Sequence, residues 1–231
     1  AGDRLLNAAI VDDANRWFWR TIQSEPLYGI SHGVGGIGYA LARLAARTND
    51  DSYWSAARGA VAFEHAGYDE TLPSWPDRRA GTPFESTSGW CTGADGVALT
   101  RLDLLQRGAT AGLDETQLRN DFDRALAATA DTPGQFARGL CDRDHLCCGT
   151  FGRVALYRRA ARAECVDGLT SVAAKRLTDA ALQRAARNGQ LALSWTNHQW
   201  DNVGLFTGTT GVGYELLRQT APELPCLLLF E

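Results

Sequence analysis

The sequence lacks a charge excess, a long hydrophobic run and any methionine. Its 231 residues include 23 Lys or Arg and 27 Asp or Glu, which gives a formal net charge of −4. Nucleic-acid-binding domains are typically basic, so this balance excludes that class of partner. An apolar run of about 18 residues, which a transmembrane helix needs, does not occur. The N-terminal segment is charged rather than apolar, which excludes a secretory signal peptide and favours a cytoplasmic protein.

Methionine is absent even at position 1. Because translation begins with methionine, we expect the chain to be a piece of a longer protein. The composition is otherwise that of an ordinary globular domain, with 45% hydrophobic and 22% charged residues. It excludes a disordered or collagen-like chain, and no linker or low-complexity segment divides residues 1–231.

Glycine, in contrast, is abundant, and it marks an internal repeat. Four Gly-x-x-Gly steps begin at Gly33, Gly93, Gly149 and Gly208, at intervals of 60, 56 and 59 residues. Blocks that recur at such even spacing indicate a repeat architecture. Glycine before a helix allows a close approach of the backbone, and the bare N–H groups of a helix start favour polar or anionic ligands. We therefore expect the four steps to surround one site.

Helical patterns fill each repeat. After each glycine pair, apolar residues lie on one face of a helix, as Ile37 and Leu41 do. Further amphipathic stretches alternate with these runs and cover residues 51–67, 114–130 and 172–188. Strand signals are confined to residues 191–195 and 227–230. We predict an all-α fold of stacked helical hairpins, with a repeat of about 58 residues.

Cysteines occupy equivalent places in two consecutive repeats. Cys91 and the pair Cys147–Cys148 stand just before their glycine steps. Without a secretory signal, metal binding or catalysis is a better expectation than disulfides. Three thiolates suit zinc, which keeps a fourth position open when it is catalytic. Alternatives are ordinary buried cysteines, a disulfide between Cys147 and Cys148, or a structural site that Cys141 or His145 completes. Two further cysteines, Cys165 and Cys226, are interpreted as packing residues.

His32 stands in the first repeat at the place that Cys91 and Cys148 occupy in theirs. This placement directs the imidazole to the same site, where it can donate or accept a proton. We predict a catalytic role for His32, and the plain alternative is a hydrogen-bonded structural histidine. His65 and His198 have no such placement, and we interpret them as structural.

Taken together, these motifs resemble those of the lanthionine synthetase C-like cyclase family. They are Ser31-His32-Gly33-x-x-Gly36, Trp90-Cys91-x-Gly93, Cys147-Cys148-Gly149-x-x-Gly152 and Gly204-Leu-Phe206-x-Gly208-x-x-Gly211, in the order and spacing of that family. The resemblance extends from about residue 25 to the C-terminus. It implies an α/α toroid of seven helical hairpins, of which this chain would form a partial ring.

The resemblance also implies an activity, a cofactor and a substrate. Family members cyclise ribosomal peptides in which Ser and Thr have been dehydrated to dehydroalanine and dehydrobutyrine. Zinc deprotonates a peptide thiol, and the thiolate adds to the dehydrated residue to form a (methyl)lanthionine thioether. By this resemblance, Cys91, Cys147 and Cys148 hold Zn²⁺, and His32 is the acid or base at the α-carbon.

Two departures from the family pattern concern the site itself. The chain has Cys147-Cys148-Gly149 where Cys-His-Gly is common, and this resembles a subgroup of the class II (LanM-type) synthetases. An arginine of the stand-alone cyclases is replaced by Thr87, and a tyrosine by Thr92. We predict Thr92 and Arg153 as substrate-binding residues instead.

A third departure concerns the extent of the chain. The family places a catalytic Asp well upstream of the histidine, and class II synthetases carry an N-terminal dehydratase domain. Neither is present, so we interpret residues 1–231 as the C-terminal portion of a cyclase domain whose partners are the precursor peptide and the remainder of the synthetase. The alternatives are a non-catalytic zinc- and peptide-binding module and another toroid enzyme, such as a prenyltransferase or a glycosidase. A glycosidase needs a carboxylate pair, which Asp95, Asp142 and Asp144 do not convincingly form.

Overall fold

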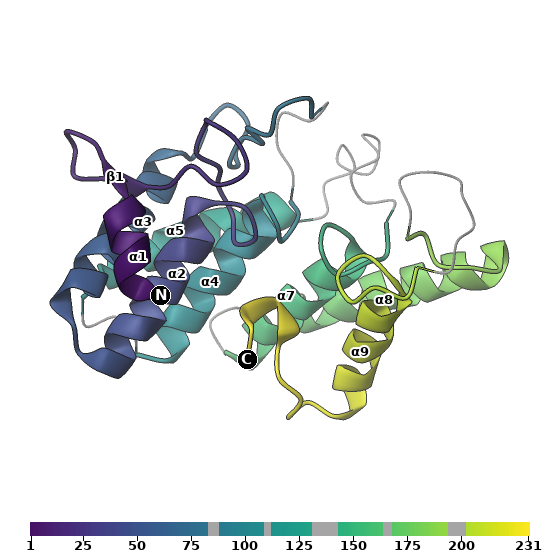
Figure 1. Ribbon diagram of the computed structural model, residues 1–231. Helices are drawn as coiled ribbons and strands as arrows, with labels where there is room; N and C mark the ends of the chain where they lie inside the picture. The colour runs from purple at the N-terminus through teal and green to yellow at the C-terminus, as the bar shows by residue number, and fades with distance from the viewer. Residues whose placement is uncertain (83–87, 109–111, 131–142, 164–167, 194–201) are drawn as a thin grey trace. The chain divides into compact units, whose positions relative to one another are not determined.

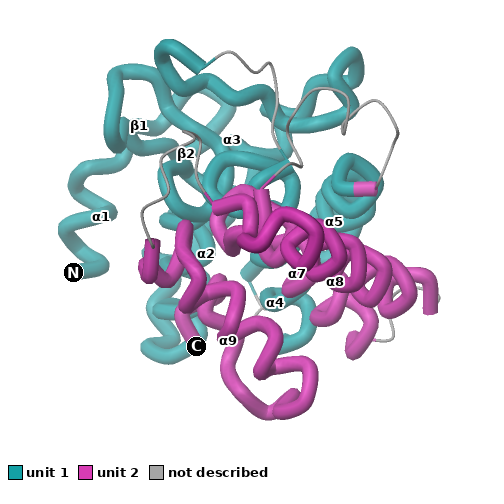
Figure 2. The backbone as a smooth tube through the Cα atoms, turned by 90° about the vertical axis from the view of Figure 1, so that its right-hand side faces the viewer, with its two compact units in different colours: residues 1–129 teal, residues 130–231 magenta. Residues whose placement is uncertain are grey.

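A computed structural model describes residues 1–82, 88–108, 112–130, 143–163, 168–193 and 202–231. These residues belong to two compact units, Ala1–Thr129 and Ala130–Glu231 (Figure 2). Helices make up most of the described residues (Figure 1), and this confirms the predicted all-α class. Within the described residues, no helix is long and apolar enough to cross a membrane.

The first unit contains two helical hairpins. Its elements are α1 (Gly2–Ala8), β1 (Ile10–Val11), β2 (Trp17–Phe18), α2 (Val34–Thr48), α3 (Asp51–Ala66), α4 (Ala94–Gln106) and α5 (Glu115–Thr129). Helix α2 packs against α3, and α4 packs against α5. The glycine-started helices α2 and α4 also pack against each other, so the repeats predicted from the sequence are stacked within this unit.

The second unit continues the same pattern. It contains α7 (Thr150–Arg162), α8 (Leu169–Asn188), α9 (Thr209–Thr220) and a short 3-10 helix, η1 (Leu227–Leu229). Helices α7 and α8 form the third hairpin, and α9 begins the fourth repeat and contacts α7. The predicted helix at residues 172–188 is therefore correct but begins three residues earlier, at Leu169.

Burial distinguishes the two helices of a hairpin. Every residue of α4 from Ala94 to Leu104 is buried, which explains why this helix has little amphipathic character. Its partner α5 buries one stripe, which includes Leu118 and Phe122. Helices α7 and α8 show the same contrast. In the second and third hairpins, the helix that follows the glycine step is thus the core helix, and its partner covers it with one apolar face.

Strands were the least accurate part of the sequence prediction. Residues 227–229 form η1 and not a strand, and no strand occurs at residues 191–193; residues 194–195 lie outside the described part. The observed sheet pairs β1 with β2 in antiparallel fashion, with Ile10 opposite Phe18. Strands of two residues are too short to produce an alternating hydrophobic pattern, so the sequence contains no signal for them.

Candidate metal centre

All predicted site residues except Arg153 lie on loops that fold back over the start of a helix. Each of these helices begins directly after the first glycine of its step, which is the N-cap. The second glycine therefore lies in the first turn and not before the helix. A Cβ at this second glycine would collide with the carbonyl of the residue six positions earlier, in all four repeats: Ile30, Trp90, Leu146 and Leu205. The close approach of the loop thus requires glycine.

A hydrogen bond closes the same loop. The N–H of the first helical residue donates to a carbonyl seven residues earlier in three repeats, from Val34 to Leu27, from Thr150 to Arg143 and from Thr209 to Asn202, each at 2.8 Å. In the second repeat the residue at the corresponding position is Thr87, which lies outside the described residues. The residues four and five positions before the second glycine therefore lie on a loop of the same geometry in these repeats.

This common geometry corrects the alignment of the histidine. His32 stands four positions before the second glycine of its step, as do Thr92 and Cys148. Cys91 stands five positions before it, as does Cys147. The equivalence of His32 with Cys148 is therefore correct, whereas its equivalence with Cys91 is wrong by one residue. The corrected equivalence follows a simple rule. One loop position carries the candidate metal ligands Cys91 and Cys147, and the next position carries His32 and Cys148.

Cys147 and Cys148 form a pair of free thiols. Their Sγ atoms are 3.3 Å apart, and both side chains are half-buried. This separation is too long for a covalent S–S bond, so the disulfide alternative is wrong. Two thiolates on one tetrahedral zinc, each at about 2.3 Å, lie about 3.8 Å apart. A small side-chain rotation therefore suffices for both thiols to bind one ion.

Hydrogen bonds hold the loop around this pair. The Cys147 N–H donates to the Phe206 carbonyl at 2.9 Å, and the Cys148 N–H donates to His145 Nδ1 at 3.3 Å. The lone pair of that buried nitrogen is thus engaged by the backbone, which argues against Nδ1 of His145 as a fourth ligand. Cys141, the other proposed ligand, lies outside the described residues.

Asp144 has a structural role in the same loop. Its carboxylate lies 2.6 Å from the Arg184 guanidinium and accepts the Ala192 N–H at 2.9 Å. These bonds join the loop to α8 and to the segment after it. Asp142, Cys165 and His198 lie outside the described residues, and the sequence interpretations of these residues stay predictions.

Cys91 and His32 are joined through the backbone in the first unit. The Cys91 carbonyl accepts the Ser31 N–H at 3.1 Å and the His32 N–H at 3.4 Å. Cys91 is buried, and its Sγ lies 3.8 Å from the hydroxyl of Thr92, which is also buried. The imidazole of His32 is half-buried. The structure thus brings the predicted proton donor close to one predicted metal ligand.

The two predicted substrate contacts are both buried side chains. Thr92 is 2% exposed, and Arg153, in α7, is 5% exposed. Their predicted contact with substrate stays a prediction.

A buried ion-pair network that the sequence did not reveal lies in the same unit. Glu64 (α3), Arg101 (α4) and Asp121 (α5) are at most 1% exposed. Arg101 lies 3.0 Å from Glu64 and 3.1 Å from Asp121, and Asp121 also binds His65 Nδ1 at 2.6 Å. Burial alone would lower the pKa of Arg101, but the two carboxylates raise it above its ordinary value. His65 is therefore structural, as predicted.

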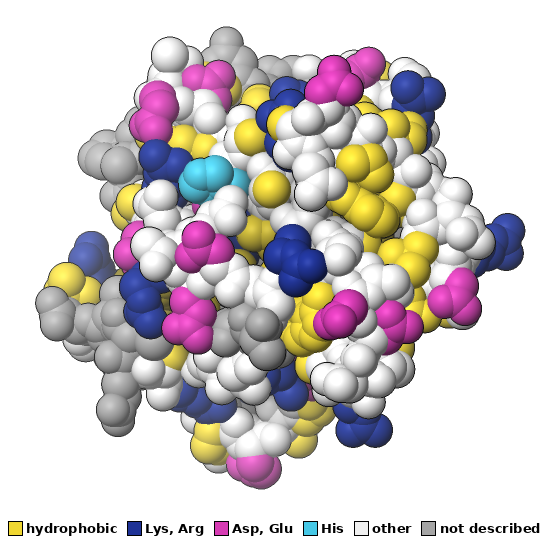
Figure 3. All heavy atoms as spheres, turned by 90° about the vertical axis from the view of Figure 1, so that its left-hand side faces the viewer, with side chains coloured by type: hydrophobic (Ala, Val, Ile, Leu, Met, Phe, Trp, Pro, Cys, Tyr) yellow, Lys and Arg dark blue, Asp and Glu magenta, His cyan; other side chains and the backbone are white. Residues whose placement is uncertain are grey.

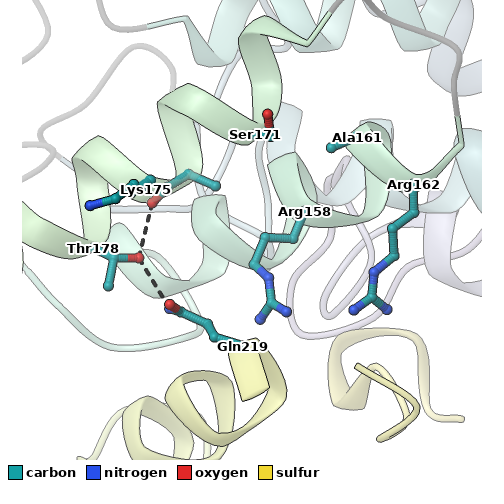
Figure 4. Close-up of a pocket in the computed structure, with 8 residues that line it drawn as sticks. Arg158, Ala161, Arg162, Ser171, Lys175, Thr178 and Gln219 are labelled. Carbon is teal, nitrogen blue, oxygen red and sulfur yellow. Dashed lines mark hydrogen bonds between the residues drawn. The ribbon is translucent and has the colours of Figure 1, made fainter. Parts of the chain in front are cut away.

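A separate pocket in the second unit contains none of the predicted site residues. It has a volume of about 300 Å³ and lies among α7, α8 and α9, with Arg158 and Arg162 side by side on its wall (Figure 4). Arg158 lies 3.1 Å from Glu215, and Arg162 donates to the Pro222 carbonyl at 2.7 Å. These guanidinium groups are already bound to the chain itself, so the pocket does not compete with the thiol pair as the candidate site.

The surface of the first unit agrees with the charge balance of the sequence. On the face that Figure 3 shows, acidic and basic side chains are interspersed with hydrophobic ones. Among the described side chains on this face, the basic ones do not gather into one continuous patch.

Comparison with known proteins identifies the family. The sequence matches the family described as lanthionine synthetase C-like protein over residues 3–229, and the chain therefore belongs to it. The match begins earlier than residue 25, where the motifs first show the resemblance. A search of curated proteins found no match. The stacked helical hairpins agree with the all-α toroid fold of this family, which is generally associated with lanthionine-forming cyclisation of peptides.

Proposed function

We propose that this chain is the zinc-binding portion of a lanthipeptide cyclase of the class II type. The observation that carries the proposal is the pair of thiols at Cys147 and Cys148, which lie 3.3 Å apart just before helix α7 in a member of this family. Its substrate would be a dehydrated precursor peptide, and its product a thioether ring. The proposal includes a cytoplasmic location and an N-terminal remainder of the synthetase as partner.

Cys91 would complete the donor set. We propose Cys91, in the first unit, as the third thiol ligand beside Cys147 and Cys148. Within each unit, an N–H donates to the carbonyl of the equivalent residue in the next repeat, from Ser31 to Cys91 and from Cys147 to Phe206. If the second and third repeats follow the same rule, Cys91 is the neighbour of Cys147. Three thiolates would then leave one zinc position for the substrate thiol.

The chemistry divides between the metal and the histidine. Bound zinc would convert the substrate thiol, whose pKa is ordinarily about 8.5, into a thiolate at neutral pH. The sulfur then bonds to the β-carbon of the dehydrated residue, and the electron pair of the double bond moves onto the α-carbon as an enolate. His32, protonated on its imidazole, gives its proton to the α-carbon. The proton released by the thiol restores the imidazolium, so the reaction balances.

His32 is suited to this role by its position. It occupies the same loop position as Cys148, and its N–H is bound to the Cys91 carbonyl at 3.4 Å. Because the imidazole is half-buried rather than enclosed, a substrate can reach it. Thr92 and Arg153 would contact the substrate in place of the tyrosine and arginine of the stand-alone cyclases.

Metal content tests the proposal directly. We expect about one zinc per chain in the purified protein, and loss of that zinc in Cys148→Ala. Cys226→Ala is the matched control, because Cys226 is also a free cysteine of the second unit but lies outside the glycine loops. A folded wild-type protein without zinc would overturn the proposal. Zinc without ring formation on a dehydrated peptide would indicate the non-catalytic binding module.

A further inference from the structure

The loop that carries His32 is attached to the buried ion-pair network. The Gly29 N–H donates to Oε1 of Glu64 at 2.7 Å, while Oε2 of the same carboxylate faces Arg101 at 3.0 Å. Glu64 therefore connects helices α3 and α4 to the segment that immediately precedes His32. A carboxylate with no exposure to solvent and two separate partners has little freedom to move.

Gly29 in turn lies directly against the loop of Cys91. Its φ is +89°, a conformation that favours glycine, and a Cβ there would lie 2.6 Å from Thr92 Cα and 2.7 Å from the Cys91 carbonyl. The same carbonyl accepts the N–H groups of Ser31 and His32. Glu64 thus holds one end of a short segment whose other end is the predicted proton donor, and the segment packs on a predicted metal ligand along its length.

The start of α2 has a glycine, Gly35, where the Glu64 carboxylate packs against the helix. A Cβ at Gly35 would collide with both carboxylate oxygens of Glu64. The equivalent residues of the other three repeats are not glycine but Asp95, Phe151 and Thr210. The first turn of a helix also favours a negative charge, because its N–H groups are unpaired and its dipole is positive. Gly35 therefore marks a place built for Glu64 in the first repeat.

Stability alone is a weak explanation for this arrangement. Desolvation of a buried ion pair offsets much of the attraction between its charges, and apolar residues of similar size often stabilise a fold as well. The ion pair of Glu64 with Arg101 contacts the loop before His32, so its effect on the geometry of that loop is a better explanation. We propose that Glu64, held by Arg101, is a positioning residue that sets His32 relative to Cys91. This inference rests on the proposed cyclase function.

Two variants of the full chain test the proposal in different ways. Glu64→Gln keeps an acceptor for the Gly29 N–H but removes the charge that faces Arg101. Gly29→Ala leaves the ion pair intact and displaces the loop directly, so it decides the question if Glu64→Gln does not fold. Glu70→Gln is the matched control, because Glu70 is 74% exposed and its ion pair with Arg124 lies on the surface.

The first readout does not depend on activity. The chain contains four histidines, so the imidazole resonance of His32 can be assigned by NMR with a His32→Gln variant. We expect this resonance to shift in Glu64→Gln and in Gly29→Ala, and to stay in place in Glu70→Gln. An unshifted His32 resonance in the folded variants would overturn the proposal, even if the wild type does not cyclise peptides.

The second readout separates positioning from stability. With a dehydrated peptide, and well below the unfolding temperature, we expect kcat of the Glu64 and Gly29 variants to fall about 10- to 100-fold, with KM and zinc content little changed. Misplacement of a proton donor has this signature, because substrate binding does not depend on it. Unchanged kcat in zinc-loaded, folded variants would also refute the proposal. Absence of zinc or cyclisation in the wild type would instead count against the proposed function, and the NMR readout would still decide the role of Glu64.

Discussion

Replacement of Gly152 by alanine tests whether the loop of the thiol pair needs its close approach to the helix. In an ordinary helix, a Gly→Ala change stabilises the fold by about 1 kcal/mol. Gly152 is different, because a Cβ there would collide with the Leu146 carbonyl. The loop from Arg143 to Cys148 must then move away from α7.

The cost of this movement follows from the hydrogen bonds that it strains. We expect the movement to strain three backbone hydrogen bonds of the loop. They are Thr150 N–H to the Arg143 carbonyl (2.8 Å), Phe151 N–H to the Asp144 carbonyl (3.4 Å) and Cys147 N–H to the Phe206 carbonyl (2.9 Å). Each contributes about 1 kcal/mol, so their loss costs about 3 kcal/mol. After subtraction of the gain in helix propensity, we expect Gly152→Ala to destabilise the protein by about 2 kcal/mol.

Urea unfolding followed by circular dichroism measures this change, and zinc content measures its effect on Cys147 and Cys148. Gly213→Ala is the matched control, since Gly213 lies in α9 and a Cβ there would meet no atom within 4 Å. We expect the control to be stabilised by about 0.5 to 1 kcal/mol. If Gly152→Ala were stabilised to the same extent, the close approach would not be the reason for the second glycine.

Two further predictions concern individual cysteines. Cys148→His restores the common Cys-His-Gly motif. Because three thiolates donate more charge to zinc than two thiolates and an imidazole, we expect this variant to keep zinc but to cyclise a dehydrated peptide more slowly than the wild type. An equal or faster rate would contradict this reasoning. Burial raises the pKa of the Cys226 thiol above its ordinary value of 9.0. Its thiolate therefore forms only at higher pH than in the unfolded chain, so alkylation of Cys226, followed by mass spectrometry, should be slow near pH 8 when the protein is folded and fast when it is unfolded. Equal alkylation in both states would show that burial does not protect this thiol.

Local signals in the sequence predicted much of the fold. The helix at residues 51–67 is observed as α3 at Asp51–Ala66, and the one at residues 114–130 as α5 at Glu115–Thr129. Both depend on apolar spacing within one helix, which neighbouring segments do not alter. The N-cap glycines were also visible in the sequence, since they recur at nearly equal intervals, and Cys147 and Cys148 were visible as candidate ligands.

Other features have no local signal. The β1–β2 pairing involves two residues on each side, which is too short for an alternating pattern. The equivalence of His32 with Cys91, in contrast, could have been corrected from the sequence itself, because His32, Thr92 and Cys148 all stand four positions before the second glycine.

The sequence by itself determined the repeat and the helical class, because both depend on short local patterns that recur along the chain. Only the tertiary structure decided the use of Glu64, whose carboxylate reaches Gly29, 35 residues away, and Arg101 on another helix. An ion pair of this kind depends on how helices pack, and one glutamate in an amphipathic helix is no different from another until that packing is known. The same packing brings Ser31 and His32 to the carbonyl of Cys91, which is 60 positions after Ser31 and 59 after His32.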